Sequence, residues 1–191
     1  LYLKLGQDAD AVIAYQNSVS ISQRIGDRDG ERTALTSSGD LYRKRNELEL
    51  AIVFYKQSVN VTETIRKDIQ ALPNTLQESY IQSIAETYRS LADLLIIQGR
   101  IGEAQQVLEY LKVQELNDFS KGIRSATTLP ETSFNIYENQ IKVKYNSLIT
   151  FGSEYYNCEQ QRCLQYEALK TQYQSLSTEF QTFIRPIHKL N

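Results

Sequence analysis

Glycine and proline are scarce in this chain of 191 residues, which contains eight glycines and three prolines. These residues mark the tight turns of hairpin-rich β architectures, so their scarcity argues against such a fold and favours long regular elements. Tryptophan and methionine are absent, whereas tyrosine occurs 13 times. Tyrosine is therefore expected to provide most of the aromatic packing.

The chain also lacks a long apolar run and a strong excess of either charge. The longest apolar run, Leu91–Ile97, is interrupted by Asp93 and is far shorter than the roughly 20 residues that cross a bilayer. A net charge of −2 disfavours affinity for nucleic acid or anionic lipid. We therefore expect neither a membrane nor a nucleic-acid partner. Because the first residue is Leu1 and not methionine, we also expect a fragment of a longer protein.

What the chain does contain is an internal repeat. In its second copy Gly39 lies three residues before Tyr42, Ala51 follows nine residues after that tyrosine, and a bulky residue comes four later. Each copy has a large leading residue, which is Tyr2, Tyr42 or Leu95, and a glycine or asparagine lies four residues after it. Both residue types tolerate the left-handed conformation that ends a helix. Each copy therefore predicts two helices joined by a short turn. The three copies comprise Tyr2, Gly6, Ala11 and Tyr15; Gly39, Tyr42, Asn46, Ala51 and Tyr55; and Ala92, Leu95, Gly99, Ala104 and Leu108.

This pattern resembles the tetratricopeptide repeat, in which leucine-glycine-x-x-tyrosine is followed by alanine-x-x-x-phenylalanine. The small residues let the two helices of a repeat approach closely, and the tyrosine or leucine fills the space beside them. The resemblance implies helix pairs that each bury one face against the next, so that a continuous core forms by stacking. We therefore predict an all-α protein with a tetratricopeptide-like, right-handed helical-repeat solenoid over residues 1–119. It would contain about three repeats, the first one truncated.

The repeats are stretched, since 40 residues separate Ala11 from Ala51 and 53 separate Ala51 from Ala104. Both spacings exceed the standard repeat length of about 34 residues. The additional residues of the first spacing surround residues 25–30, and this longer form resembles the kinesin-light-chain-like variety of the repeat. The second excess contains Pro73, which predicts a corner before a long helix.

A second resemblance covers residues 80–116, including Ser83–Arg89 and Gly99–Gln105. This stretch is similar to the last repeat of cyanobacterial proteins in which tetratricopeptide repeats precede a CHAT domain, a caspase-like peptidase module. The resemblance implies a recognition or regulatory region just upstream of such a domain. None of the catalytic module lies within these 191 residues, so an enzyme is not expected.

The last third of the chain does not continue the repeat pattern. Residues 120–132 are polar with a Thr-Thr-Leu-Pro corner, which predicts a linker. Two helices at about 133–156 and 160–186 would form an antiparallel helical hairpin over 133–191, with its turn near Asn157. Such a hairpin can stand alone, pack back on the repeats or pair with another chain, and the pattern does not choose. Its coiled-coil-like seam comprises Phe134, Tyr137, Ile141, Tyr145, Leu148 and Tyr155 on one side and Tyr166, Leu169, Tyr173, Leu176, Phe180, Phe183 and Ile187 on the other.

The tetratricopeptide resemblance implies a peptide groove lined by the first helix of each repeat. Mixed charge at helical spacing suits an acidic or extended peptide, although the same pattern is typical of any soluble helix surface. The best-known arrays of this family clamp a terminal carboxylate with lysine and asparagine, which do not occupy the matching positions here. The predicted groove residues are Thr36, Asp40, Arg43, Lys44, Arg89, Asp93, Ile96 and Ile97.

No constellation in the sequence points to catalysis, a cofactor or a metal ion. Cys158 and Cys163 lie five residues apart around the predicted turn, and the single histidine, His188, is expected far from them. We predict unpaired thiols, a reducing interior and a cytoplasmic protein. The cluster Arg43-Lys44-Arg45 is predicted to end a helix, where cations offset the helix dipole.

These patterns predict a non-catalytic scaffold that binds a protein or peptide partner, without cofactor or metal. The alternative is a module for self-association, which would form a homo-oligomer through the C-terminal hairpin or the ends of the repeat array.

Overall fold

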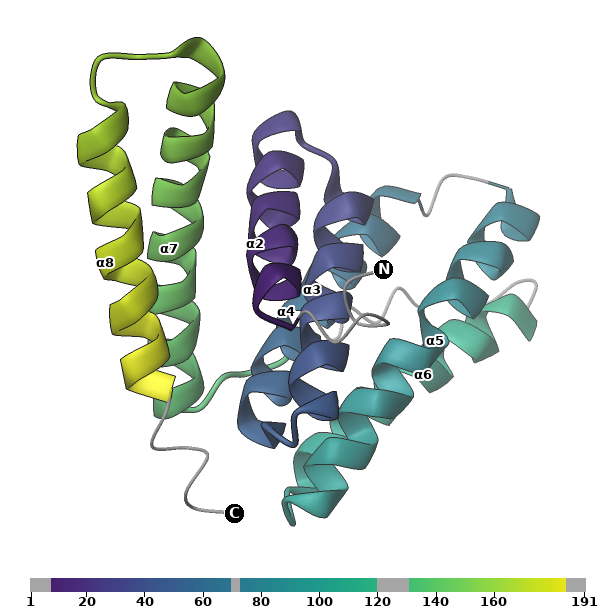
Figure 1. Ribbon diagram of the computed structural model, residues 1–191. Coiled ribbons are helices and arrows are strands. Elements are labelled where there is room, and N and C mark those ends of the chain that lie inside the picture. Colours follow the sequence, from purple (N-terminus) through teal and green to yellow (C-terminus); the bar gives the residue numbers. More distant parts are fainter. Residues whose placement is uncertain (1–7, 70–72, 120–130, 185–191) are drawn as a thin grey trace.

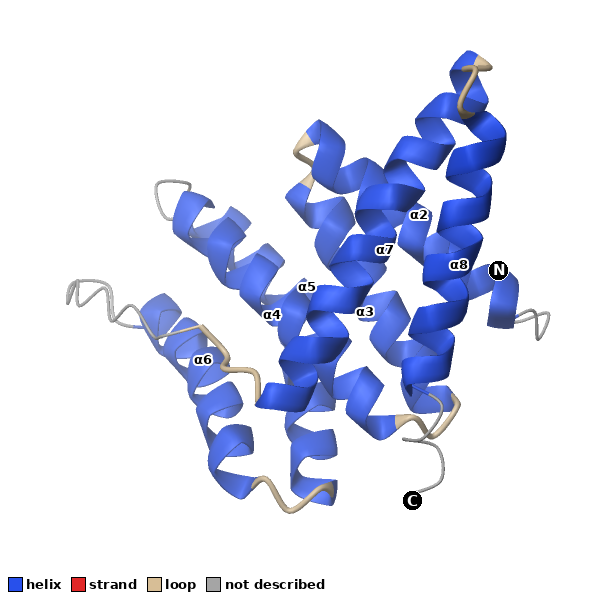
Figure 2. Ribbon diagram, turned by 90° about the vertical axis from the view of Figure 1, so that its left-hand side faces the viewer, coloured by secondary structure: helices blue, strands red, loops and turns tan. Residues whose placement is uncertain are grey.

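The computed structural model describes residues 8–69, 73–119 and 131–184 (Figure 1). Within these ranges every regular element is an α-helix (Figure 2), so the predicted all-α class is confirmed. The helices are α2 (Asp8–Ile25), α3 (Arg28–Lys44), α4 (Leu48–Ile69), α5 (Asn74–Ile97), α6 (Ile101–Phe119), α7 (Ile136–Gln161) and α8 (Tyr166–Ile184).

The helix ends follow the signals in the sequence. Asn46 and Gly99 have φ angles of 59° and 70°, which confirms the left-handed residues predicted after α3 and α5. The third predicted position, Gly6, lies outside the described residues. Arg43 and Lys44 form the last turn of α3, where their charges oppose the helix dipole. Pro73 immediately precedes α5, as its missing N–H allows at a helix start.

Helices α2, α3 and α4 lie side by side, and α4 in turn contacts α5, which pairs with α6 (Figure 1). Helix α3 approaches α4 closely at Gly39, whose backbone faces the ring of the fully buried Tyr55. The neighbouring Tyr42 stacks on Phe54 with ring centroids 5.1 Å apart. The small and aromatic positions of the sequence repeat therefore meet at the α3–α4 contact.

Replacing Gly39 by alanine is expected to lower the free energy of unfolding by about 1–3 kcal/mol, because the added carbon overpacks the contact. It would lie 2.7 Å from Cε1 of Tyr55, which is too close for two carbon atoms. Gly102→Ala in α6 is the matched control, since a carbon added there meets nothing within 4 Å. That control should be neutral or slightly stabilising through helix propensity. Urea unfolding followed by circular dichroism measures both, and equal stabilisation by the two substitutions would contradict the packing.

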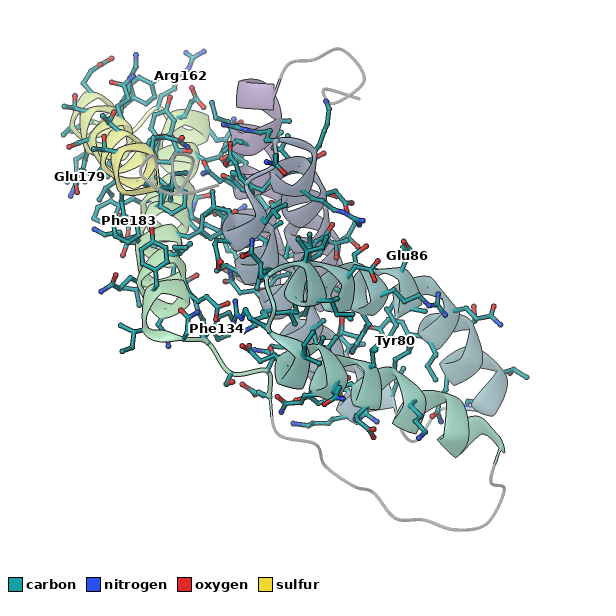
Figure 3. The ribbon with its side chains drawn as sticks, turned by 90° about the horizontal axis from the view of Figure 1, so that it is seen from below. Tyr80, Glu86, Phe134, Arg162, Glu179 and Phe183 are labelled. Carbon is teal, nitrogen blue, oxygen red and sulfur yellow. A yellow bond between two sulfur atoms is a disulfide. The ribbon has the colours of Figure 1, made fainter. Side chains whose placement is uncertain are left out.

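Helices α7 and α8 pack against each other with opposite directions. The ring centroid of Tyr137 near the start of α7 lies 5.6 Å from that of Phe183 near the end of α8. The ring centroids of Tyr155 and Tyr173 are also 5.6 Å apart. In Figure 3, Phe183 lies on the α7–α8 pair, at a distance from Tyr80 on α5. Ile187 of the predicted seam falls outside the described residues.

The pair lies against the preceding helices through α7, which contacts both α2 and α4 (Figure 1). The ring of Tyr145 meets that of Phe54 edge to face, with centroids 4.6 Å apart. On α8, the hydroxyl of Tyr173 donates a hydrogen bond of 3.0 Å to the side-chain oxygen of Gln16 on α2. Of the three arrangements that the sequence left open, the structure has α7 and α8 folded back on the same chain.

The predicted starts of both helices and the predicted end of the first were wrong by a few residues. The predicted end of the second, at residue 186, lies outside the described residues. At the start of α7, the side chain of Asn135 accepts from the Glu138 N–H while the Glu138 carboxylate accepts from the Asn135 N–H, a capping box that starts the helix at Ile136. At its end, α7 continues through Asn157, where the turn was predicted, and stops at Arg162 in the left-handed conformation. The turn therefore occupies residues 162–165. Most of the predicted linker lies outside the described residues.

Candidate functional site

Helices α3 and α5 provide the face on which the sequence predicts a peptide groove. Two polar contacts join them directly. Thr36 and Thr87 place their hydroxyl oxygens 3.5 Å apart, and the Arg43 guanidinium donates a 3.0 Å hydrogen bond to Ser90 Oγ. Both pairs advance along the two helices in the same direction, so α3 and α5 run roughly parallel here. We call the surface carried by the eight predicted residues the α3–α5 face.

Three of the predicted residues on α3 are already engaged within the chain. Thr36 Oγ1 lies 2.7 Å from Ser58 Oγ on α4. The carboxylate of Asp40 accepts a 2.6 Å hydrogen bond from the Tyr55 hydroxyl. Burial, followed by this hydrogen bond, raises the pKa of Tyr55 well above its usual range. The side chains of Thr36, Asp40 and Arg43 therefore brace α3 against α4 and α5 as well as lining the face.

The remaining five residues are exposed, with Lys44 at the end of α3 and the others along the second half of α5. Arg89 directly precedes Ser90, the residue that accepts the hydrogen bond from Arg43. Ile96 and Ile97 are 49% and 65% exposed and lie almost two helical turns beyond Ser90, whereas α3 ends one residue after Arg43. The structure therefore brings together the helices that carry the charged residues, whereas the two isoleucines lie beyond the end of α3.

Sequence reasoning missed the residues that hold this face together. Thr87 and Ser90 lie three residues apart on α5 and are both buried, so they belong to one side of that helix. Their polarity on a side that packs inward was the available signal. It marks a contact between helices to which side-chain hydrogen bonds contribute.

A second polar feature, a buried charge cluster, lies where α7 begins. Lys56 on α4 is 1% exposed, and Glu138 on α7 is completely buried. The Lys56 ammonium donates to Glu103 at 2.6 Å, to the Ser133 carbonyl at 2.7 Å and to Glu138 at 3.0 Å. Arg100 adds a second cation, 2.8 Å from the other oxygen of Glu138. We name Lys56, Arg100, Glu103 and Glu138 the junction cluster, because they connect α4, the start of α6 and the start of α7.

Within the junction cluster, electrostatics favour the charged form of Glu103. Burial by itself would raise the pKa of Glu103, but hydrogen bonds from Arg100 and Lys56 outweigh it and hold that pKa below its usual value. A carboxylate with a lowered pKa stabilises the fold at neutral pH, and that contribution is lost as acid protonates it. The nearby Glu49 behaves oppositely, because burial raises its pKa more than Arg100 lowers it.

The junction cluster is suited to holding helices together and not to chemistry. Its ammonium donates to three acceptors and its carboxylates are paired with cations, so neither a free base nor a free nucleophile results. Within the described ranges, no group of three or more histidine, cysteine or acidic side chains is placed to hold a metal ion. The signal in the sequence was a lysine in the middle of the run Leu50–Val59, which is otherwise without charge.

The prediction of unpaired thiols was wrong, since Cys158 and Cys163 form a disulfide. The left-handed residue Arg162 turns the chain back at the end of α7 and leaves the two Cα atoms 5.0 Å apart, within the range that a disulfide spans. Disulfides persist in oxidising compartments and are rare in the cytosol. The pairing therefore weakens the expectation of a reducing interior. His188 lies outside the described residues.

Comparison with known proteins provides no relative from which a role could be transferred. No protein-family model matches the chain, and no curated protein or solved structure matches it either. Among the described helices, none combines the length and apolar character that a membrane span requires.

Proposed function

We propose that this chain is a non-catalytic protein-interaction scaffold of the tetratricopeptide type, which binds an extended peptide segment of a partner protein on the α3–α5 face. The observation that carries the proposal is the α3–α5 contact. Two helices that begin successive sequence repeats lie next to each other and expose charged residues of both signs, Asp40, Arg43, Lys44, Arg89 and Asp93. Side chains of both signs can hydrogen-bond the backbone and the charged groups of an extended peptide.

The position of the C-terminal helices supports the same proposal. In the repeat pattern, α2 and α4 are second helices, and α7 packs on both of them. We propose that α7 and α8 are a helical hairpin that covers the second-helix side of a short right-handed solenoid, leaving the first-helix side for a partner. The packing of Gly39 against Tyr55 is the contact expected between the two helices of one repeat.

The alternative, self-association through the hairpin seam, has less support. Phe180 and Ile184 are buried, and Tyr173, Leu176 and Phe183 pack against the core of the same chain. A second chain could use these residues only if two molecules exchanged their α8 helices. A regulatory link to a downstream caspase-like domain remains part of the proposal through the resemblance of residues 80–116.

Selection from a display library of random peptides tests the scaffold function. We expect enriched peptides whose affinity falls about five- to thirtyfold on Arg89→Glu, because reversing an exposed charge at a binding face costs roughly 1–2 kcal/mol. Lys170→Glu is the matched control, since it makes the same charge change on α8, far from α5 (Figure 1). Peptides that respond equally to both substitutions, or a selection without enrichment, would contradict the proposal.

A further inference from the structure

The turn between α7 and α8 holds a disulfide whose two sulfur atoms have different surroundings. Cys158 lies in the last turn of α7 and is 5% exposed. Cys163 follows the helix end and is partly exposed. In Figure 3, Arg162, which precedes it, lies on the α7–α8 side of the molecule, far from Glu86 on α5. The disulfide is therefore separate from the α3–α5 face.

Open space adjoins the more exposed cysteine. A cavity of about 260 Å³ is lined by Glu159, Arg162, Cys163 and Tyr166. Cys158 does not line it, so a molecule in the cavity meets the disulfide at Cys163. Two tyrosine hydroxyls compete for the Glu159 carboxylate, with Tyr166 at 3.3 Å and Tyr155 at 3.5 Å. Glu159 and Arg162 contribute one acidic and one basic residue to the lining.

The backbone at the turn is held in a conformation that arginine disfavours. Arg162 has φ 52° and ψ 44°, a left-handed region in which side chains other than glycine, asparagine and aspartate are uncommon. The Cys163 N–H donates a 3.0 Å hydrogen bond to the Cys158 carbonyl across it. The disulfide joins the same two residues, so it restrains this turn directly, and its opening would remove that restraint.

We propose that Cys158–Cys163 is a thiol–disulfide exchange site at which a low-molecular-weight thiol attacks Cys163. The incoming thiolate forms a bond to Cys163 Sγ, the bond between the two cysteines breaks, and Cys158 leaves as a thiolate that takes a proton from solvent. A second thiolate then attacks the external sulfur of the mixed disulfide and releases Cys163 as a thiolate. Overall, two external thiols are oxidised to one disulfide, and the protein disulfide gains two electrons and two protons.

The choice of sulfur follows from access. Exchange requires the attacking sulfur to approach the disulfide along its axis, so a buried sulfur reacts slowly even when the bond itself is accessible from the other end. Cys158 is nearly enclosed within the protein, whereas Cys163 borders the cavity. Cys163 is therefore the attacked sulfur and Cys158 the leaving and resolving one.

Mass spectrometry of the native, oxidised protein with millimolar reduced glutathione tests the proposal. After acid quenching and alkylation, trypsin cleaves behind Arg162 and places the two cysteines on separate peptides. We expect the glutathione adduct on the Cys163 peptide, in at least about tenfold excess over the Cys158 peptide. An adduct mainly on Cys158, an even distribution, or a disulfide that glutathione reduces only after denaturation would overturn the proposal.

Single-cysteine variants give an independent measurement. With oxidised glutathione, Cys158→Ser should form a lasting adduct at Cys163, because no resolving thiol remains. Cys163→Ser should react at Cys158 at least about tenfold more slowly in the native protein and at an equal rate in urea, where access no longer differs. Equal rates in the native proteins would overturn the assignment of Cys163 as the attacked sulfur.

Discussion

Replacing Lys56 by methionine is expected to lower the free energy of unfolding by about 3 kcal/mol. Breaking a buried ion pair by removing one partner typically costs roughly 3–5 kcal/mol, because the other charge is left in the interior. The completely buried Glu138 would lose the Lys56 ammonium 3.0 Å away. Arg100 remains 2.8 Å from its second oxygen, which places the effect at the lower end of that range. Urea unfolding followed by circular dichroism measures it.

The double variant Lys56→Met with Glu138→Gln is the control for this result. Glutamine removes the charge of Glu138 but retains an acceptor for the Asn135 N–H, so the capping box of α7 is preserved. Since no carboxylate is then left uncompensated at position 138, we expect the double variant to be more stable than Lys56→Met alone. If the double variant lost as much stability as Lys56→Met and Glu138→Gln together, the two residues would not be coupled. The junction cluster would then not hold α7 in the way the structure indicates.

Tyr145→Ala should produce a loss of similar or larger size, about 3–5 kcal/mol, which is typical of removing a large aromatic side chain from a core. Tyr145 is 1% exposed and has an aromatic ring on each side. Phe54 on α4 lies 4.6 Å away and Phe180 on α8 lies 5.8 Å away, measured between ring centroids. The substitution therefore opens a cavity where α4, α7 and α8 meet. Thermal and urea unfolding should both report it.

Tyr145→Phe separates the ring from the hydroxyl group. Among the described residues, the buried Tyr145 hydroxyl makes no hydrogen bond of good geometry, and its polar neighbour is Ser38. A buried polar group without a partner costs free energy, so removing it should be neutral or slightly stabilising. A loss below about 1 kcal/mol for Tyr145→Ala would contradict the packing of α7 on α4. A large loss for Tyr145→Phe would instead show that the hydroxyl has a partner.

Both Lys56→Met and Tyr145→Ala weaken the attachment of α7 to α4, but by different physical means. The junction cluster holds the start of α7 through charge, and Tyr145 holds its middle through aromatic contact. The peptide function proposed for the α3–α5 face depends on neither residue directly, since both lie where α7 meets α4. A destabilised variant that still folds should therefore retain the proposed peptide binding, which would separate the α3–α5 face from the contact of α7 with α4.

Local features of this fold could be predicted because they depend on neighbours in the chain. A residue that ends a helix in the left-handed conformation must be compatible with φ above zero, and Asn46 and Gly99 satisfy that condition by their own chemistry. The apolar periodicity of 166–184 similarly determined which side of α8 is buried. The four predicted groove residues on α5 could be placed on one helix. Their relation to α3 depended on Thr87 and Ser90, whose partners only the tertiary structure shows.

The sequence by itself therefore determined the helical class, the ends of several helices and the apolar sides of α7 and α8, because short-range spacing and turn chemistry are sufficient for these. Only the tertiary structure decided which surfaces meet. Lys56 and Glu138 are 82 residues apart, and nothing in the spacing of either indicates the other. The apolar seam of α8 would suit any complementary helix, and the cysteine pair required the turn to form at Arg162 and not at Asn157. Apolar burial is non-directional, so periodicity identifies a buried side without identifying the partner that covers it.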